Sequence, residues 1–433
     1  MSSAVAATPA VPAARPTAPL PAARNHPLDG VVREKLKITD IKVTPLSWVP
    51  KQKPFWIGPD YVAWKEDACI VEVFTDQGIK GIGEASPYGR PDVMKKFIET
   101  YARPMLIGFN PFDVEHLAGI WAGPVYTVET RWAGSAPWAG VDCALWDIIG
   151  RAKGLPVYKL LAMQAAPNPR VRIYASAGVH YQWNKRPEDL IDEALRAKEQ
   201  GYTAYKFRLG TDWKRSGMTA RKYIPWLRRL RAAVGADFGL MLDSTMRLTL
   251  TESLELAPAL EEIKLLLFEE PMSQWSETAV EDHVKLKRAL PTVIVAGGEQ
   301  FINHFEFKPW VERNAFDVVQ PDANVMGLSE AWHSATLAGL RNKRCCPHNW
   351  QNTPTMVANG ALAAAIPNLL MLEMCFVENP LRMEIFVNPP VVSRGYMELP
   401  DKPGYGMELA KDLEKRFPWV PGRFTKPNPD LAA

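Results

Sequence analysis

The sequence predicts an α/β protein in which a closed barrel of alternating strands and helices follows a smaller α+β domain. The chain has 433 residues, which is too many for one ordinary core, so two domains are expected. Between residues 171 and 374, short apolar runs alternate with helical patterns, as in parallel strands joined by helices. Before that region strand patterns come first and helical patterns follow, which is typical of a separate α+β domain.

Eight apolar runs define the barrel strands. They are Val171–Ala177, Ala204–Leu209, Phe238–Asp243, Leu265–Glu269, Val293–Gly297, Phe316–Gln320, Lys343–Pro347 and Leu369–Met374. Helical patterns between them include Pro187–Gln200, Lys222–Val234, Thr249–Leu260 and Ser329–Gly339. Eight parallel strands over roughly 200 residues fit a closed α/β barrel, which typically takes about 250 residues.

The first domain begins with Lys37–Thr44, where apolar and polar residues alternate as in a half-buried strand. A strand pair follows, Ala68–Phe74 and Ile79–Ala85, with Thr75–Gly78 as the turn between them. From about Asp92 to Leu161 the apolar spacing becomes helical. We therefore predict a disordered Ala/Pro-rich tail over 1–36, an α+β domain over 37–165, a barrel over 166–390 and a C-terminal segment, 391–433, that packs on the first domain.

Composition limits the classes of function and the cellular locations that can be expected for this protein. The chain has 51 basic and 48 acidic residues, a net charge of +3, which gives no electrostatic case for binding nucleic acid or a membrane surface. Five cysteines without a C-x-x-C pair do not form a disulfide framework, so we expect a reducing, cytoplasmic location. No apolar run approaches the roughly 18 to 20 residues that span a bilayer, and the tail lacks the features of a secretory signal.

Carboxylates end three consecutive runs. Run three ends in Asp243, run four leads to Glu269 and run five to Glu299. The carboxyl ends of barrel strands share one mouth, where barrel enzymes keep their active sites. Three carboxylates would repel one another there unless a hard divalent cation with oxygen ligands, such as Mg²⁺, bound between them.

Charged or titratable groups follow the other runs too. Lys206 and Arg208 end run two and point to the same face, because side chains alternate along a strand. Asp322, His348 and Glu373 follow or end runs six, seven and eight. A single carboxylate after a strand could merely cap the next helix, the two cations could be structural ion-pair partners, and a lone histidine could belong to the core.

The order of these motifs resembles the enolase superfamily, in its mandelate racemase/muconate lactonizing enzyme-like branch, of the acid-sugar dehydratase type. The motifs are K-x-R, Asp, E-E-P, G-E, Q-P-D, His and Glu, together with the helix motif Asp142-Cys-Ala-Leu-Trp-Asp147, Gly154-Leu-Pro and the closing loop Leu399–Gly406. The resemblance covers nearly the whole folded chain. It implies a modified TIM (β/α) barrel with an N-terminal α+β capping domain that the C-terminal segment completes.

The resemblance also assigns roles. The ligands of one Mg²⁺ per subunit would be Asp243, Glu269 and Glu299. The Asp322 carboxylate would orient His348 and raise its basicity, and Glu373 would hydrogen-bond the substrate carboxylate. The segments Trp48–Trp64 and Ala85–Pro91 would be specificity loops, with Trp56, Trp64 and Trp350 as an apolar wall. The relatives are often homo-oligomers, so we expect one here.

One departure from the family concerns the reaction. Racemases of this family carry Lys at both positions of the strand-two motif, whereas this chain has Arg208, which stays protonated and is a poor base. His348 is therefore the favoured base, and elimination of water from a sugar acid is the favoured reaction. Three alternatives stay open: an epimerase or racemase that uses Lys206 and His348 on opposite faces, a lyase acting on a keto-sugar, and a binding protein that has lost turnover.

Overall fold

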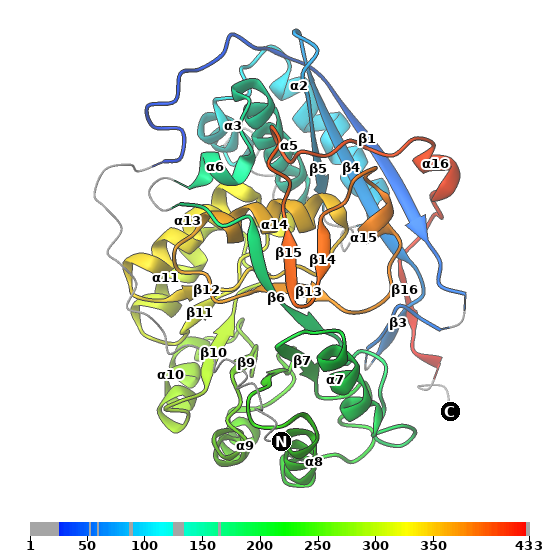
Figure 1. The fold of residues 1–433 in the computed structure, drawn as a ribbon, viewed down its shortest axis with the longest axis vertical. Helices are drawn as coiled ribbons and strands as arrows, with labels where there is room; N and C mark the ends of the chain where they lie inside the picture. Colours follow the sequence, from blue (N-terminus) through cyan, green and yellow to red (C-terminus); the bar gives the residue numbers. More distant parts are fainter. Residues whose placement is uncertain are drawn as a thin grey trace, which may run out of the picture.

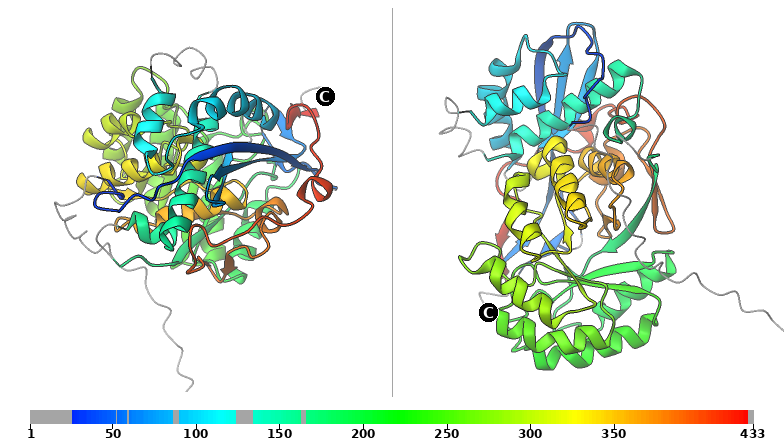
Figure 2. Two further views of the ribbon diagram at one scale, coloured as in Figure 1. Left: turned by 90° about the horizontal axis from the view of Figure 1, so that it is seen from above. Right: turned by 90° about the vertical axis from the view of Figure 1, so that its left-hand side faces the viewer.

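The structure is a computed structural model that describes residues 26–51, 53–58, 60–85, 90–123, 134–162 and 166–429. Most of the predicted tail, residues 1–25, lies outside the described residues, and so do residues 86–89 of the second predicted specificity loop. Residues 26–36 run along the first domain, where Leu36 is buried and the Lys153 ammonium donates to the backbone carbonyl of Val32 at 3.1 Å. Figure 1 shows two lobes, the first domain above and the barrel below, and the right-hand view of Figure 2 shows the same division from another side.

The first domain is built on an antiparallel sheet with strand order β1-β4-β5, which confirms the three strand predictions. The strands are β1 (Ile38–Trp48), β4 (Glu66–Thr75) and β5 (Lys80–Ala85). Gly78 has a φ of 75°, a conformation that glycine adopts at low cost, and it allows the tight turn between β4 and β5. The helices of this domain are α1 (Pro91–Phe97), the π-helix η2 (Ile98–Ala102), α2 (Arg103–Leu106), α3 (Val114–Trp121), α5 (Ala136–Lys153) and α6 (Val157–Leu161).

A short hairpin, which the sequence pattern did not predict, lies in the Trp- and Pro-rich segment. Its strands are β2 (Trp56–Ile57) and β3 (Tyr61–Ala63), and β16 (Thr425–Pro427) near the end of the chain pairs with β3. The Ile57 amide donates to the Val179 carbonyl at 3.0 Å, so the hairpin reaches the barrel. The hairpin therefore extends the first domain over the loop that follows the first barrel strand (Figure 1).

The barrel strands lie where the eight apolar runs predicted them, although several are shorter. They are β6 (Arg170–Ser176), β7 (Ala204–Arg208), β8 (Gly239–Asp243), β9 (Leu267–Glu269), β10 (Ile294–Gly297), β11 (Val318–Val319), β12 (Arg344–Cys345) and β13 (Leu372–Cys375). They pair in parallel in chain order, and β13 returns to pair with β6. The expected closed ring is not strict, because β12 meets the chain before β13 only at an isolated bridge between Cys345 and Leu369.

Helices between these strands cover the outside of the barrel, as the alternating pattern predicted. They are α7 (Asp189–Glu199), α8 (Ala220–Val234), α9 (Leu250–Glu262), α10 (Ala279–Ala289), α11 (His304–Glu312), α12 (Ala323–Met326), α13 (Leu328–Leu340) and α14 (Thr353–Ala365). Helix α15 (Leu381–Glu384) follows the last barrel strand, and the C-terminal segment contributes the hairpin β14 (Val391–Ser393) and β15 (Tyr396–Glu398), and α16 (Leu413–Arg416). β15 pairs with β6, so part of this segment lies against the barrel.

Helix α5 joins the parts of the molecule through the two aspartates of its motif. Asp142 accepts hydrogen bonds from the backbone amide (2.9 Å) and hydroxyl (2.6 Å) of Ser329 on α13. Asp147 accepts from the amide of Ile82 on β5 (3.0 Å) and from the amide of Tyr405 in the closing loop (2.7 Å). Both carboxylates are buried, and burial raises the pKa of each to about 6. One helix therefore holds the barrel, the sheet and the C-terminal segment together.

Two further observations bear on the predicted location. All five cysteines are buried and free. Among the described residues, no helix combines the length and the apolar character that crossing a bilayer requires.

Candidate active site

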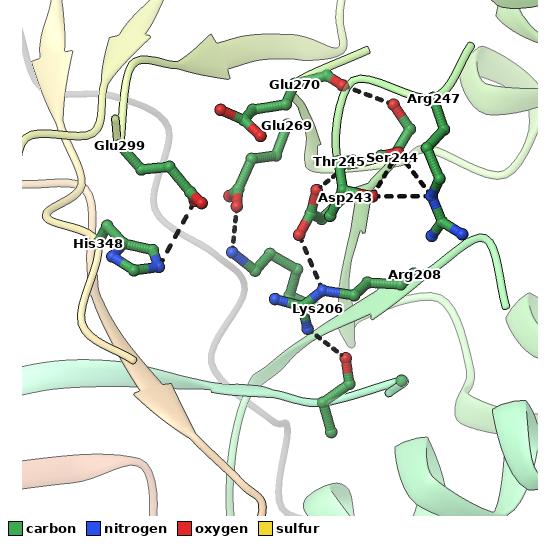
Figure 3. A network of polar contacts seen from close by, with 12 residues as sticks. Lys206, Arg208, Asp243, Ser244, Thr245, Arg247, Glu269, Glu270, Glu299 and His348 are labelled. Carbon is green, nitrogen blue, oxygen red and sulfur yellow. Dashed lines mark hydrogen bonds and ion pairs between the residues drawn. The ribbon is translucent and has the colours of Figure 1, made fainter. Parts of the chain in front are cut away.

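Parallel register brings the predicted site residues to one edge of the barrel. Arg208 on β7 is the Cα partner of Asp243 on β8, which in turn is the partner of Glu269 on β9. Glu299 follows two residues after the end of β10, the next strand. Figure 3 shows these side chains, with Lys206 and His348, pointing toward one another. The structure therefore brings together the carboxylates and cations that the sequence placed at the barrel mouth.

Two buried cations contact the carboxylates. The Lys206 ammonium contacts Glu269 and lies 2.8 Å from Glu373 Oε1. The Arg208 Nε lies 3.0 Å from Asp243 Oδ2. All five side chains are at most about a twentieth exposed, so these contacts are sheltered from water and strong.

His348 and Asp322 form a buried pair. The Nδ1 atom of His348 lies 2.7 Å from Asp322 Oδ2, while Asp322 Oδ1 accepts from the side-chain amide of Asn359 at 2.9 Å. Nε2 of His348 lies 3.5 Å from Glu299 and 3.6 Å from Glu373. The dyad therefore fixes the ring with its second nitrogen directed toward the carboxylate cluster.

The cluster shifts the pKa values of its members. Burial raises the pKa of Glu269 to about 8, since Asp243 and nearby glutamates add negative charge and Lys206 offsets only part of it. Burial would lower the pKa of His348, but Glu299, Glu373 and Asp322 raise it to about 10. Burial would likewise raise the pKa of Glu373, yet Lys206 and His348 hold it well below its usual range. The contacts with Lys206 and His348 therefore favour the ionised form of Glu373.

Asp243, Glu269 and Glu299 could hold a divalent cation. Their donors are all oxygens, which suit a hard ion, and burial together with mutual repulsion raises the pKa of Glu269 and of Glu299. A bound cation would relieve this repulsion. The oxygens of the three carboxylates are nevertheless not all close to one another. Lys206 contacts Glu269 and Arg208 contacts Asp243, which directs these two carboxylates toward the cations. Within the described ranges, one trio of possible ligands has its donor atoms all within 4.8 Å, and it lies elsewhere, at His26, Glu115 and His333.

Two of the three tryptophans predicted to form an apolar wall lie against Arg208. The guanidinium carbon lies 5.0 Å from the ring centre of Trp56 and 4.5 Å from that of Trp350. Arg208 Nη1 also donates to the Ala177 carbonyl at 2.6 Å. Trp64, the third predicted member, donates to the carbonyl of Arg423 instead. Trp56 belongs to the β2–β3 hairpin, so Arg208 connects the first domain to the carboxylate cluster.

A cavity of about 270 Å³ opens beside the cluster. Its lining includes Arg208, Glu299 and Glu270 from the barrel, with Trp56 and Tyr61 from the hairpin. A larger cavity of about 1050 Å³, between Trp48 and Val392, has none of the eight predicted site residues in its lining. Of these two cavities the smaller one adjoins the cluster, and we therefore regard it as the candidate substrate site.

Sequence reasoning missed two polar residues of the site. Arg247 lines the smaller cavity, and Asn359 on α14 orients Asp322 from behind. Arg247 follows Asp243 by four residues, and no pattern marks the direction of a loop side chain. Asn359 is a polar residue within a run of small apolar residues that forms a buried helix. A buried amide needs a hydrogen-bond partner, and this requirement could have identified Asn359 as a candidate site residue.

Comparisons with known proteins place this geometry in a family. Residues 41–162 match the family described as the mandelate racemase / muconate lactonizing enzyme N-terminal domain, and residues 189–413 match the enolase C-terminal domain-like family. An arabinonate dehydratase of Saccharolobus solfataricus is 29% identical over 355 residues, which cover 81% of this chain and 90% of that protein. A D-xylonate dehydratase of Haloferax volcanii is 28% identical over 360 residues, covering 79% and 83%.

A solved structure supports the same assignment. The protein from Bordetella bronchiseptica RB50 is 30% identical, with a TM-score of 0.78, and the match covers 90% of this chain and 100% of that chain. The two family matches cover the capping domain and most of the barrel in chain order. This chain therefore belongs to the enolase superfamily, in its mandelate racemase/muconate lactonizing enzyme branch.

Proposed function

We propose that this protein is a Mg²⁺-dependent dehydratase of a sugar acid. The observation that carries the proposal is the carboxylate cluster at the ends of β8, β9 and β10, with the Asp322–His348 dyad directed into it. The arabinonate and xylonate dehydratases among its relatives support the same reaction class. In this reaction the substrate loses its α proton and its β hydroxide, and the enol product tautomerises to a 2-keto-3-deoxy acid.

Asp243, Glu269 and Glu299 are the proposed ligands of the metal. When bound, Mg²⁺ would supply positive charge that stabilises the negative charge developing on the substrate carboxylate. Lys206 and Arg208 add fixed positive charge on the other side of these carboxylates. Glu270 is not a proposed ligand, because its carboxylate accepts from the side-chain amide of Gln274 at 3.0 Å.

His348 is the proposed proton-transfer group. As a neutral imidazole it would take the α proton at Nε2, and as an imidazolium it would protonate the leaving hydroxide to give water. The raised pKa of His348 makes the imidazolium the resting form, which suits the acid role. Glu299 contributes more than any other carboxylate to the rise in the pKa of His348. His348 could therefore act as a base only when the negative charge of Glu299 is compensated.

Glu373 is the proposed partner of the substrate carboxylate. Its lowered pKa keeps it ionised beside Lys206 and His348, and an ionised carboxylate only accepts hydrogen bonds. Donation from Glu373 to the substrate therefore requires that it take up a proton as the substrate binds.

The environment of Lys206 favours dehydration over epimerisation. Burial would lower the pKa of Lys206, but Glu269 and Glu373 raise it well above its usual range. Such an ammonium stabilises negative charge and does not take up a proton. A two-base epimerase would need Lys206 as its second base, so the environment of this residue opposes that alternative.

Incubation of the protein with Mg²⁺ and a library of sugar acids in D₂O tests the proposal by NMR and mass spectrometry. We expect loss of water to give a 2-keto-3-deoxy acid. Deuterium entering the α position without loss of water would show an epimerase instead. Removal of the metal with a chelator should abolish turnover, and added Mg²⁺ should restore it.

The variant His348→Asn tests the proton-transfer role. Loss of a general acid–base group typically costs about 10²- to 10⁴-fold in rate, and we expect kcat to fall at least that far while Mg²⁺ still binds. His116→Asn, at an exposed histidine on α3, is the matched control and should leave kcat unchanged. Full activity of His348→Asn would contradict the assigned role.

A further inference from the structure

Arg247 is a cation of the candidate site without a carboxylate partner. Its Nη1 donates to the Gly210 carbonyl at 2.8 Å, and its Nε donates to the Thr245 hydroxyl at 2.8 Å and the Ser244 carbonyl at 3.3 Å. Within the described part of the chain, no carboxylate is in ion-pair contact with it and no acceptor contacts Nη2. The other two cations, Lys206 and Arg208, already hold carboxylates of the cluster.

The backbone after β8 directs this side chain into the cavity. Thr245 and Met246 both adopt a left-handed conformation, with φ values of 48° and 58°, which is costly for residues other than glycine. Thr245 also donates its amide to Asp243 Oδ1 at 2.7 Å. The turn therefore fixes Arg247 relative to Asp243, and Figure 3 shows the two side chains joined through this loop, with His348 on the far side of the cluster.

Arg247 and the carboxylate cluster adjoin the same cavity of about 270 Å³. Its lining contains Glu299 and Arg208 at the cluster and Arg247 with Thr245 from the loop. This volume lies just below the range of about 300–1,000 Å³ for ligand pockets, which suits a small acid. The phenol of Tyr61 covers the cavity from the hairpin, and burial raises its pKa while Arg208 and Arg247 oppose the rise.

A half-buried guanidinium with a free edge in a partly enclosed cavity is a site for an anion. Burial lowers the pKa of Arg247 and the Asp243 carboxylate offsets only part of this effect, so the environment still penalises the charge. The planar guanidinium fork binds carboxylates with high geometric specificity. A ligand that reaches from the cluster to Arg247 would therefore present an anionic group at each end.

We propose that Arg247 binds a second, terminal carboxylate, so that the preferred substrate is an aldaric acid, a sugar acid with a carboxylate at both ends. This rests on the proposed function, which assigns the first carboxylate to the cluster. The two carboxylates bind in one cavity: the reacting end lies at Glu299, which His348 contacts at 3.5 Å, and the terminal end lies at Arg247.

Calorimetry with matched pairs of acids tests the assignment. Galactarate is compared with galactonate, and xylarate with xylonate, each titrated in the presence of Mg²⁺ into the His348→Asn protein, which prevents turnover from obscuring binding. We expect each diacid to bind about 10- to 100-fold more tightly than its monoacid, the range for a hydrogen bond to a buried charge. Arg247→Met in the same protein should abolish that preference and change monoacid affinity by less than about 3-fold.

Arg231→Met is the matched control. Arg231 likewise has no carboxylate in ion-pair contact among the described residues and donates to backbone carbonyls, among them Gly235 and Phe238 at 2.7 Å, but it lies outside the cavity. This variant should keep the preference for the diacid. If Arg247→Met does not fold, Arg247→Gln removes the charge while it keeps a donor for one of the carbonyls.

Equal affinity for the members of a pair, or a preference that survives removal of Arg247, would overturn the inference. Tighter binding of an aldonate with a terminal phosphate than of the aldarate would also overturn it. Water release by the unaltered protein is measured separately. If the protein dehydrates monoacids and the Arg247 variants bind diacids and monoacids as the parent protein does, the proposed function is supported and the anion site is wrong. If the preference for the diacid depends on Arg247 but no acid is dehydrated, the anion site is supported and the proposed function is wrong.

Discussion

Arg208 is held on four sides by contacts of different kinds. Its Nε contacts the Asp243 carboxylate and its Nη1 the Ala177 carbonyl, while the rings of Trp56 and Trp350 lie against the guanidinium. A lysine ammonium is a point charge and cannot satisfy the carboxylate and the carbonyl in this flat arrangement. We therefore regard Arg208 as a positioning residue that fixes Asp243 and the hairpin relative to each other.

The variant Arg208→Lys introduces the residue that racemases of the family carry at this position. It keeps the positive charge but removes the planar guanidinium, so it tests whether the geometry of Arg208 matters in addition to its charge. We expect kcat/KM to fall by about 10- to 100-fold, the effect of a small misplacement at a site, with no gain of α-proton exchange in D₂O. The control is Arg229→Lys, whose guanidinium stacks on Trp226 at 4.1 Å on the exposed face of α8 and should leave kcat/KM unchanged. Exchange acquired by the Arg208→Lys variant would show that the second base alone had been missing.

The limits of sequence reasoning at this scale follow from backbone geometry. Lys206 and Arg208 could be assigned to one face because they belong to a strand, where side chains alternate regularly. Arg247 follows two residues with positive φ, and neither is a glycine that would have marked the turn. Trp56 and Trp350 were identified as site residues, but their contact with a cation depends on tertiary packing that no local pattern contains.

Helix α5 packs closely against β5 in the first domain. A Cβ added at Gly83 would lie 2.0 Å from the carbonyl oxygen of Gly140, and one at Gly81 would lie 1.9 Å from that of Ala144. Both neighbours are helix backbone, which cannot yield as a flexible side chain can. The glycines of β5 are therefore required for the helix that carries Asp142 and Asp147 to approach the sheet.

Gly83→Ala should force α5 away from the sheet. We expect a loss of at least about 1–3 kcal/mol of unfolding free energy, the usual cost of overpacking, and a lower Tm. Gly119→Ala on α3 is the matched control, since a Cβ there meets nothing within 4 Å and alanine favours the helix by up to about 1 kcal/mol. Equal Tm values for the two variants in a thermal unfolding experiment would contradict this account of the packing.

The elements of the barrel were predictable because their periodicity repeats eight times and each run is bounded by a helical pattern. The β2–β3 hairpin was not predictable, since its strands have two and three residues and β3 pairs with a strand more than 350 residues later. Such a contact leaves no periodic signal in either segment. The incomplete ring between β12 and β13 escaped prediction for a similar reason, because apolar runs locate strands but do not reveal where regular pairing stops.

Three parts of the molecule meet at Glu115. Its Oε1 lies 3.2 Å from Nε2 of His26, in the segment before the first strand, and 3.1 Å from Nε2 of His333 on barrel helix α13. Hydrogen bonds from the two imidazoles hold the pKa of Glu115 well below its usual value of 4.5. Burial would lower the pKa of His333, but its hydrogen bond to Glu115 raises it above 6.5. The contact between the two domains is therefore linked to pH.

The directions of these two pKa shifts define the pH range in which the contact stabilises the folded protein. A lowered carboxylate pKa gives stability that is present above about pH 4.5 and is lost as pH falls, and a raised histidine pKa gives stability that is present below about 6.5 and is lost as pH rises through the folded value. We expect Glu115→Gln to lower the unfolding free energy most between these values. The effect should reach at most about 1 kcal/mol, because Glu115 is half-exposed and solvent screens the pair.

Thermal unfolding of Glu115→Gln and the unaltered protein from pH 4 to pH 9 measures this effect as a difference in Tm. The difference should be largest near pH 5 to 6 and should shrink toward both ends of the range, since one partner loses its charge at each end. Glu99→Gln, which removes the partner of Lys95 on the same domain, is the control. That pair contains no histidine, so its Tm difference should stay constant between pH 6 and pH 9. A Tm difference for Glu115→Gln that does not vary with pH would show that the histidines are not charged partners, and that the domains are held together there by packing alone.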